Sequence, residues 1–207
     1  AETVAAEIES AGGHALALTA DAASPADTVR TVNDAVARFG RVDILVNNAG
    51  LPQQYAEGTE LERWDLGVDV TLSSAYRQSS AAIPHMIDNG GGAILNICSI
   101  AGNRIGTTSP WYDAAKAGLT GLTRHFAAKH GHDGIRTNGL CLGLIETRRT
   151  TFIHDVPEAR EQWLAASALD HVGQPEEAAA AALFLVSDDA SLITGQILIA
   201  DSGRTII

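Results

Sequence analysis

Residues 42–50 read VDILVNNAG, a short apolar run that ends in two asparagines, an alanine and a glycine. A run this short and this apolar is typical of a strand that is buried on both faces of a parallel sheet. Similar runs predict two more buried strands, at residues 93–98 and 135–141. Further strands are expected at residues 15–20 and 196–200.

Helical patterns separate these apolar runs. Ser24 followed by Pro25 fits a helix start with proline at the first helical position, and Thr59 with Glu62 fits a capping box. Pro84 is expected to kink the helix that the capping box opens. Together these signals predict helices at residues 4–11, 25–39, 59–86, 112–129 and 175–186.

The alternation of strands and helices predicts the fold class. Strand, helix and strand repeated at this spacing give an α/β fold, a Rossmann-like doubly wound parallel sheet with helices on both faces. With 207 residues, the chain is expected to form one domain over residues 1–207. Residues 146–173 depart from the pattern, and we expect this excursion to shape the substrate site.

Composition excludes several classes of partner. The chain has 14 Lys and Arg against 25 Asp and Glu, a net charge of −11, and so lacks the basic surface that nucleic acids and anionic membranes require. Its longest apolar run, residues 178–186, is about half of the ~20 residues that a membrane-spanning helix needs. Cys98 and Cys141 are expected to be free thiols, which suits a reducing cytoplasm.

Tyr112 and Lys116 are the residues that suggest chemistry most directly. They are four positions apart on a predicted helix, so both side chains project from one face, and a lysine ammonium there favours the deprotonated phenol. Ser99 follows a buried strand thirteen positions earlier, at the end where parallel sheets place their sites. Its hydroxyl could polarise a substrate carbonyl.

These motifs together resemble the short-chain dehydrogenase/reductase family. The resemblance rests on NNAG at residues 47–50, Ser99, the Tyr112-x-x-x-Lys116 pair, and the tail ITGQ at 193–196 leading to DSG at 201–203. It implies an oxidoreductase that uses NAD or NADP to interconvert a carbonyl and a secondary alcohol. Tyr112 would be the general acid and base, Lys116 would assist it while binding the nicotinamide ribose, and Ser99 would orient the substrate.

The resemblance also implies a set of cofactor-binding residues and an assembly. Besides Tyr112 and Lys116, the cofactor would lie along Asp21 at the adenine, Asn47, Ala49, Gly50, Gly143, Ile145 at the carboxamide and Thr147 near the phosphates. No metal is expected, since a helix C-terminus explains the cluster of His125, His130 and His132. The expected partners are a small alcohol or ketone and further copies of the chain in a homodimer or homotetramer.

Two departures from the family pattern affect these expectations. Thr71 stands where the family usually has a catalytic asparagine, and a hydroxyl offers fewer hydrogen bonds than an amide. The family's opening strand, glycine-rich turn, helix and second strand, which hold the pyrophosphate and select NAD or NADP, are not in these 207 residues. We therefore expect the natural polypeptide to carry roughly 40 to 50 further N-terminal residues.

Three alternatives remain open at this point. Thr71 and the missing glycine-rich turn also fit a non-catalytic binding or assembly module. Within the enzyme class, a 3-oxoacyl-acyl-carrier-protein reductase is an alternative, although residues 85–92 hold no Lys or Arg for an acidic carrier. Arg148 and Arg149 fit either a contact with an anionic substrate or a pair of solvated side chains.

Overall fold

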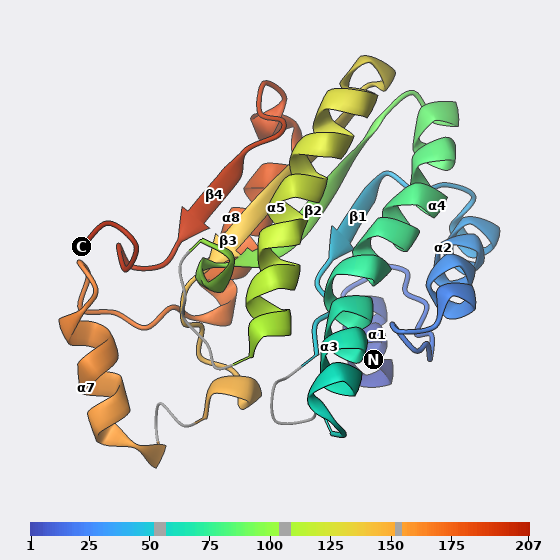
Figure 1. Cartoon of the computed structure of the whole chain (residues 1–207). Helices are drawn as coiled ribbons and strands as arrows, with labels where there is room; N and C mark the ends of the chain where they lie inside the picture. Colours follow the sequence, from blue (N-terminus) through green and yellow to red (C-terminus); the bar gives the residue numbers. More distant parts are fainter. Residues whose placement is uncertain (52–56, 104–108, 152–154) are drawn as a thin grey trace.

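Four parallel strands form the sheet of this protein. The computed structural model describes residues 1–51, 57–103, 109–151 and 155–207. The strands lie in the order β1 (Ile44–Asn47), β2 (Gly92–Ser99), β3 (Ile135–Leu142) and β4 (Ile197–Ala200). All three pairings are parallel, so the carboxyl ends of the strands lie along one edge of the sheet (Figure 1). The predicted α/β class is confirmed.

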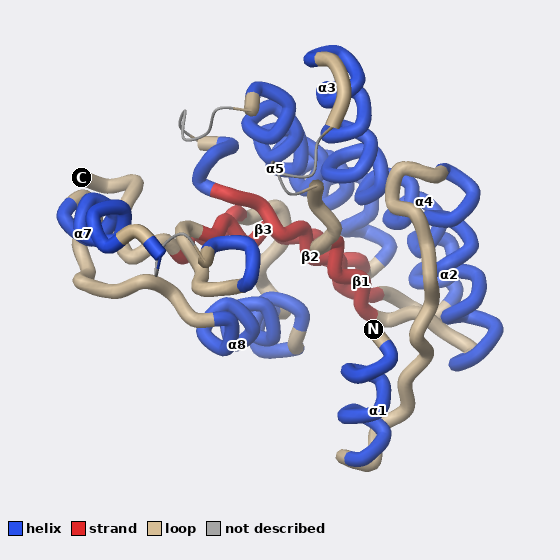
Figure 2. Tube along the Cα trace, turned by 90° about the horizontal axis from the view of Figure 1, so that it is seen from below, coloured by secondary structure: helices blue, strands red, loops and turns tan. Residues whose placement is uncertain are grey.

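Helices cover both faces of this sheet (Figure 2). One side carries α2 (Pro25–Phe39), α3 (Glu60–Val68), α4 (Ser74–Asp88) and α5 (Pro110–His130). The other side carries α1 (Glu2–Ser10) and α8 (Pro175–Val186), and α7 (Pro157–Ala165) lies near the C-terminus. In the part of the chain that the structure describes, we find no helix long and apolar enough to cross a membrane.

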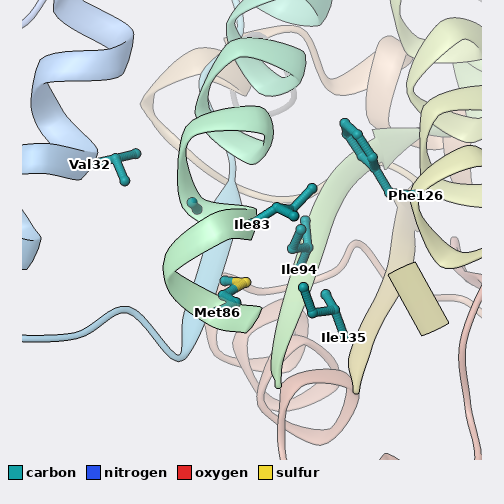
Figure 3. Packing of buried hydrophobic residues seen from close by; sticks show 7 residues of the cluster. Val32, Ile83, Met86, Ile94, Phe126 and Ile135 are labelled. Carbon is teal, nitrogen blue, oxygen red and sulfur yellow. The ribbon is translucent and has the colours of Figure 1, made fainter. Parts of the chain in front are cut away.

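Alternate residues of β2 and β3 supply the core on the two faces of the sheet. Ile94 and Ile135 pack with residues of α2, α4 and α5, a cluster that Figure 3 shows from close by. Leu95 and Leu140 point to the opposite face and pack against Leu185 of α8. The prediction that β2 and β3 are buried on both faces is therefore confirmed.

Two strand predictions are wrong or incomplete. Residues 15–20 form no strand, because no described strand pairs with them and an extended segment needs a neighbour to satisfy its backbone groups. The strand at residues 42–46 exists as β1, but it is not buried on both faces. Ile44 and Val46 are 50% and 46% exposed, since β1 is an edge strand with one weakly covered face.

The long helix predicted over residues 59–86 is divided into two. It begins as predicted, with the Thr59 hydroxyl accepting from the backbone N–H of Glu62 and the Glu62 carboxylate accepting from that of Thr59. A π-helical turn over Asp69–Ser73 then separates α3 from α4. Such a turn inserts one extra residue into a helix and often occurs at functional sites. Here it carries Thr71.

Candidate active site

The site lies where the carboxyl ends of the strands meet the first turns of α5 (Figure 1). Pro110 opens α5 at the first helical position, where its missing N–H costs nothing. Tyr112 and Lys116 follow one turn apart. The helix therefore brings both side chains to the edge at which β2 ends.

Lys116 is held beneath the surface of this site. Its side chain is 4% exposed, and its Nζ donates a hydrogen bond of 2.6 Å to the backbone carbonyl of Ile97 in β2. The same Nζ lies 5.8 Å from the ring centroid of Tyr112. Lys116 thus places a positive charge between the end of β2 and the tyrosine ring.

The pKa of this ammonium reflects its surroundings. Burial lowers the pKa of Lys116 to about 8, the Cys98 thiol acts in the opposite direction, and the charge of Arg149 lowers it further. The lysine therefore keeps most of its charge at neutral pH while being ready to donate hydrogen bonds.

Ser99 ends β2 two residues beyond the carbonyl that binds Lys116. It is half-buried, and its Oγ accepts a hydrogen bond of 3.2 Å from the backbone N–H of Ala101. The turn that follows packs closely on α5 at Gly102, where a Cβ would lie 2.7 Å from backbone atoms of Lys116 and Ala117. The glycine permits this approach, which holds the Ser99 segment against α5.

Gly50 lies close to three of the predicted site residues, just beyond the end of β1. A Cβ built on it would lie 3.9 Å from Lys116 Nζ, 3.9 Å from Arg149 Nη1 and 4.0 Å from Thr71 Cγ2. The loop after β1 is anchored there, because the backbone N–H of Leu51 donates to Thr71 Oγ1 at 3.4 Å. Residues from four segments of the chain therefore meet at Gly50, where a Cβ would be in ordinary contact with its neighbours.

Asn47 differs from the other predicted cofactor residues because its side chain lies in the core. It is 5% exposed, and its amide group donates to Ser79 Oγ at 3.0 Å and Asn96 Oδ1 at 2.8 Å. Asn96 in turn donates to Thr123 Oγ1 at 2.9 Å. This buried chain of polar groups links β1 and β2 to α4 and α5, so the side chain of Asn47 fixes the site's framework.

The segment after β3 carries the remaining predicted cofactor residues. Gly143 donates its N–H to Ala200 at 2.9 Å, and a Cβ on it would lie 2.7 Å from the Cα of Asp201. Ile145 pairs with Gly173, and Thr147 Oγ1 caps a short 3-10 turn, Arg148–Thr150. This turn and α7 belong to the excursion predicted over residues 146–173. The turn places Arg149 so that its side chain reaches the Leu51 carbonyl on the other side of the site.

Asp21 lies away from these residues, in the loop before α2, where its carboxylate accepts from the backbone N–H of Ala23 at 2.9 Å.

The histidine cluster lies at the end of α5, where His130 Nδ1 is 2.9 Å from Asp133 Oδ2. Over the described ranges, we find no group of three or more His, Cys, Asp or Glu side chains arranged to hold a metal ion.

Comparison with known proteins agrees with this geometry. The family model described as enoyl-(acyl carrier protein) reductase matches residues 1–205. The chain belongs to the short-chain dehydrogenase/reductase family. As a short-chain dehydrogenase/reductase it is an NAD(P)-dependent oxidoreductase, so the prediction of this enzyme class is confirmed.

Three relatives show how broad this similarity is. The 3-oxoacyl-acyl-carrier-protein reductase of Chlamydia trachomatis is 39% identical over 173 residues, which cover 83% of this chain and 69% of that enzyme. The cyclohexanol dehydrogenase of an Acinetobacter species is 38% identical over 208 residues, with coverages of 99% and 80%. The structure of 7α-hydroxysteroid dehydrogenase complexed with NADH and 7-oxo glycochenodeoxycholic acid matches with a TM-score of 0.89 at 34% identity, covering 98% and 79%.

Proposed function

We propose that this short-chain dehydrogenase/reductase interconverts a small carbonyl compound and its secondary alcohol, with Tyr112 as the general acid and base. The main support is the buried ammonium of Lys116, which donates a hydrogen bond to the Ile97 carbonyl and lies beside the Tyr112 ring. The phenol supplies the proton that the carbonyl oxygen takes up on reduction, and a fixed cation beside the ring favours that transfer. Ser99, at the end of the same strand as Ile97, is proposed to donate its hydroxyl hydrogen to the carbonyl oxygen.

The residues fit a dinucleotide at its nicotinamide end. NAD or NADP, when bound, supplies or accepts the hydride. The donor Nζ of Lys116 suits a hydroxyl-bearing ribose. We propose that the rest of this end is lined by Ala49, Gly143, Ile145 and Thr147. Asn47 would contribute by fixing the position of β1, and Asp21 would lie toward the adenine. Thr71 stands where the family usually has a catalytic asparagine, and we propose that its hydroxyl acts in that place.

A second candidate is a 3-oxoacyl-acyl-carrier-protein reductase, favoured by the similarity to the Chlamydia trachomatis enzyme. The net charge of −11 disfavours this second candidate, because the chain would repel an acidic carrier protein at long range. We therefore prefer a small-molecule substrate. A cytoplasmic location is also proposed, since both cysteines are free and buried; cell fractionation would test it.

The decisive experiment replaces the tyrosine. Tyr112→Phe keeps the ring that packs beside Trp111 but removes the hydroxyl, so reduction of a ketone panel should fall by at least about 10²-fold. Binding of NADH and NADPH, followed by fluorescence titration, should change by less than about threefold.

The matched control is Tyr76→Phe, which removes the hydroxyl of a 54% exposed tyrosine on α4. Its activity should equal that of the wild type. Ketone reduction by Tyr112→Phe at more than about a tenth of the wild-type rate would contradict the proposed role, since general acid/base catalysis is typically worth 10²- to 10⁴-fold. A wild-type protein that binds either dinucleotide but reduces no carbonyl would favour the non-catalytic alternative.

A further inference from the structure

Arg149 reaches across the candidate active site from the segment after β3. Its Nη2 donates a hydrogen bond of 2.9 Å to the backbone carbonyl of Leu51, which follows β1. Its Cζ lies 5.5 Å from the ring centroid of Tyr112. The guanidinium therefore lies beside the residue proposed to transfer the proton, although it comes from a different part of the chain.

Within the described part of the chain, the charge of Arg149 has no counter-ion. Its hydrogen-bond acceptor is a neutral carbonyl, and no carboxylate pairs with it among the residues that the structure describes. A guanidinium carries five N–H donors in a planar fork that matches the two oxygens of a carboxylate. The side chain is exposed, and its one hydrogen bond among the described residues is the one to Leu51, so other donors of the fork remain available to a ligand.

Arg149 and Lys116 both lie close to Gly50. A Cβ placed on Gly50 would be 3.9 Å from a nitrogen of each. The two charges interact, since Arg149 lowers the pKa of Lys116. A second cation at this position raises the cost of keeping Lys116 charged, and an anionic ligand bound between the site and Arg149 would remove that cost.

We propose that Arg149 binds a carboxylate of the substrate, so that the enzyme acts on oxo acids and the corresponding hydroxy acids. This inference rests on the proposed carbonyl–alcohol chemistry and names its substrate class. The carboxylate replaces the Leu51 carbonyl as the acceptor, since a charge-assisted, bidentate pair is roughly twice as strong as a hydrogen bond between neutral groups. Arg149 thereby holds the substrate by its acid group while its carbonyl faces Tyr112.

The test compares acids with their neutral esters. The substrates are 2-oxobutanoate, 4-oxopentanoate and 5-oxohexanoate, each paired with its methyl ester, in the presence of NADH or NADPH. For at least one pair, the wild type should prefer the acid, and Arg149→Gln should lower kcat/KM for that acid about 10- to 100-fold, the worth of a hydrogen bond to a charged group. The same variant should change kcat/KM for the ester by less than about threefold.

Arg148→Gln is the matched control, because it removes an adjacent exposed arginine of the same short turn and should leave both values unchanged. Arg149→Lys should restore part of the preference, since it keeps the charge without the fork.

Three outcomes would overturn the inference without touching the proposed function: no acid preference in the wild type, an equal loss for acid and ester in Arg149→Gln, or the same loss in Arg148→Gln. If neither these compounds nor any ketone of the panel used for Tyr112→Phe is reduced, the proposed function fails instead. In that case the role of Arg149 is tested by calorimetric titration with 4-oxopentanoate. The wild type should bind this acid, and Arg149→Gln should not. Absence of that binding in the wild type overturns the inference.

Discussion

The side chain of Lys116 is buried, and its burial makes the stability of the protein depend on pH. The pKa falls from 10.5 to about 8 on folding, chiefly because of burial. Between these two pH values the unfolded chain holds a proton that the folded chain has released. The free energy of unfolding should therefore gain a contribution as pH rises through this window, on the order of 3 kcal/mol at most.

The measurement is denaturant unfolding of the wild type and Lys116→Met between pH 7 and pH 10.5. The difference in unfolding free energy should shift in favour of the wild type as pH rises. Cys98 and Cys141 contribute with the opposite sign, because burial raises the pKa of both thiols, but both proteins contain them. A difference that stays flat over the whole range would show that Lys116 titrates normally.

At the scale of elements, α3 and α5 pack closely because one residue of α3 is a glycine. A Cβ on Gly67 would lie 2.2 Å from Cε3 of Trp111, which is 3% exposed. Gly67→Ala should therefore destabilise the protein by about 1–3 kcal/mol, since overpacking forces rigid neighbours apart. Because Trp111 adjoins Tyr112, kcat should fall as well.

Gly121 in α5 is the control, because a Cβ there meets no atom within 4 Å. Gly121→Ala should stabilise the protein by about 0.5–1 kcal/mol through helix propensity. Thermal unfolding of both variants checks the pair. Equal midpoints for Gly67→Ala and the wild type would mean that α3 can move away from Trp111 at little cost.

At the scale of the whole molecule, large apolar side chains remain exposed at the β4 end of the sheet. They include Leu183 on α8, which is 68% exposed, Leu192 at 97%, and on β4 Leu198 at 39% and Ile199 at 45%. Leu198 and Ile199 point to opposite faces of the edge strand β4, and exposed apolar residues along a sheet edge are typical of interaction surfaces. We propose that this region contacts a second copy of the chain.

Sedimentation velocity at micromolar concentration should then show a homodimer or homotetramer. Leu183→Asp should shift the protein toward smaller species, because a buried charge at an interface lacks a partner. Val4→Asp, on the opposite end of the sheet and 56% exposed, should sediment as the wild type does. A wild type that sediments as a monomer would contradict the proposal.

The sequence by itself determined the features that depend on neighbours along the chain. Ser24 and Thr59 cap their helices as predicted, because a hydroxyl needs only a backbone N–H three residues later. The helical period brought Tyr112 and Lys116 to one face for the same local reason. The apolar runs of β2 and β3 predicted strands buried on both faces, since only a two-sided core accepts them.

Tertiary structure decided the features that depend on segments far apart. Residues 15–20 have the composition of a strand, yet a strand exists only where another pairs with it. The π-helical turn at Thr71, the core position of the Asn47 side chain and the reach of Arg149 to Leu51 each require a partner from another element. Sequence spacing carries no information about such partners, because packing, and not chain distance, sets which side chains meet.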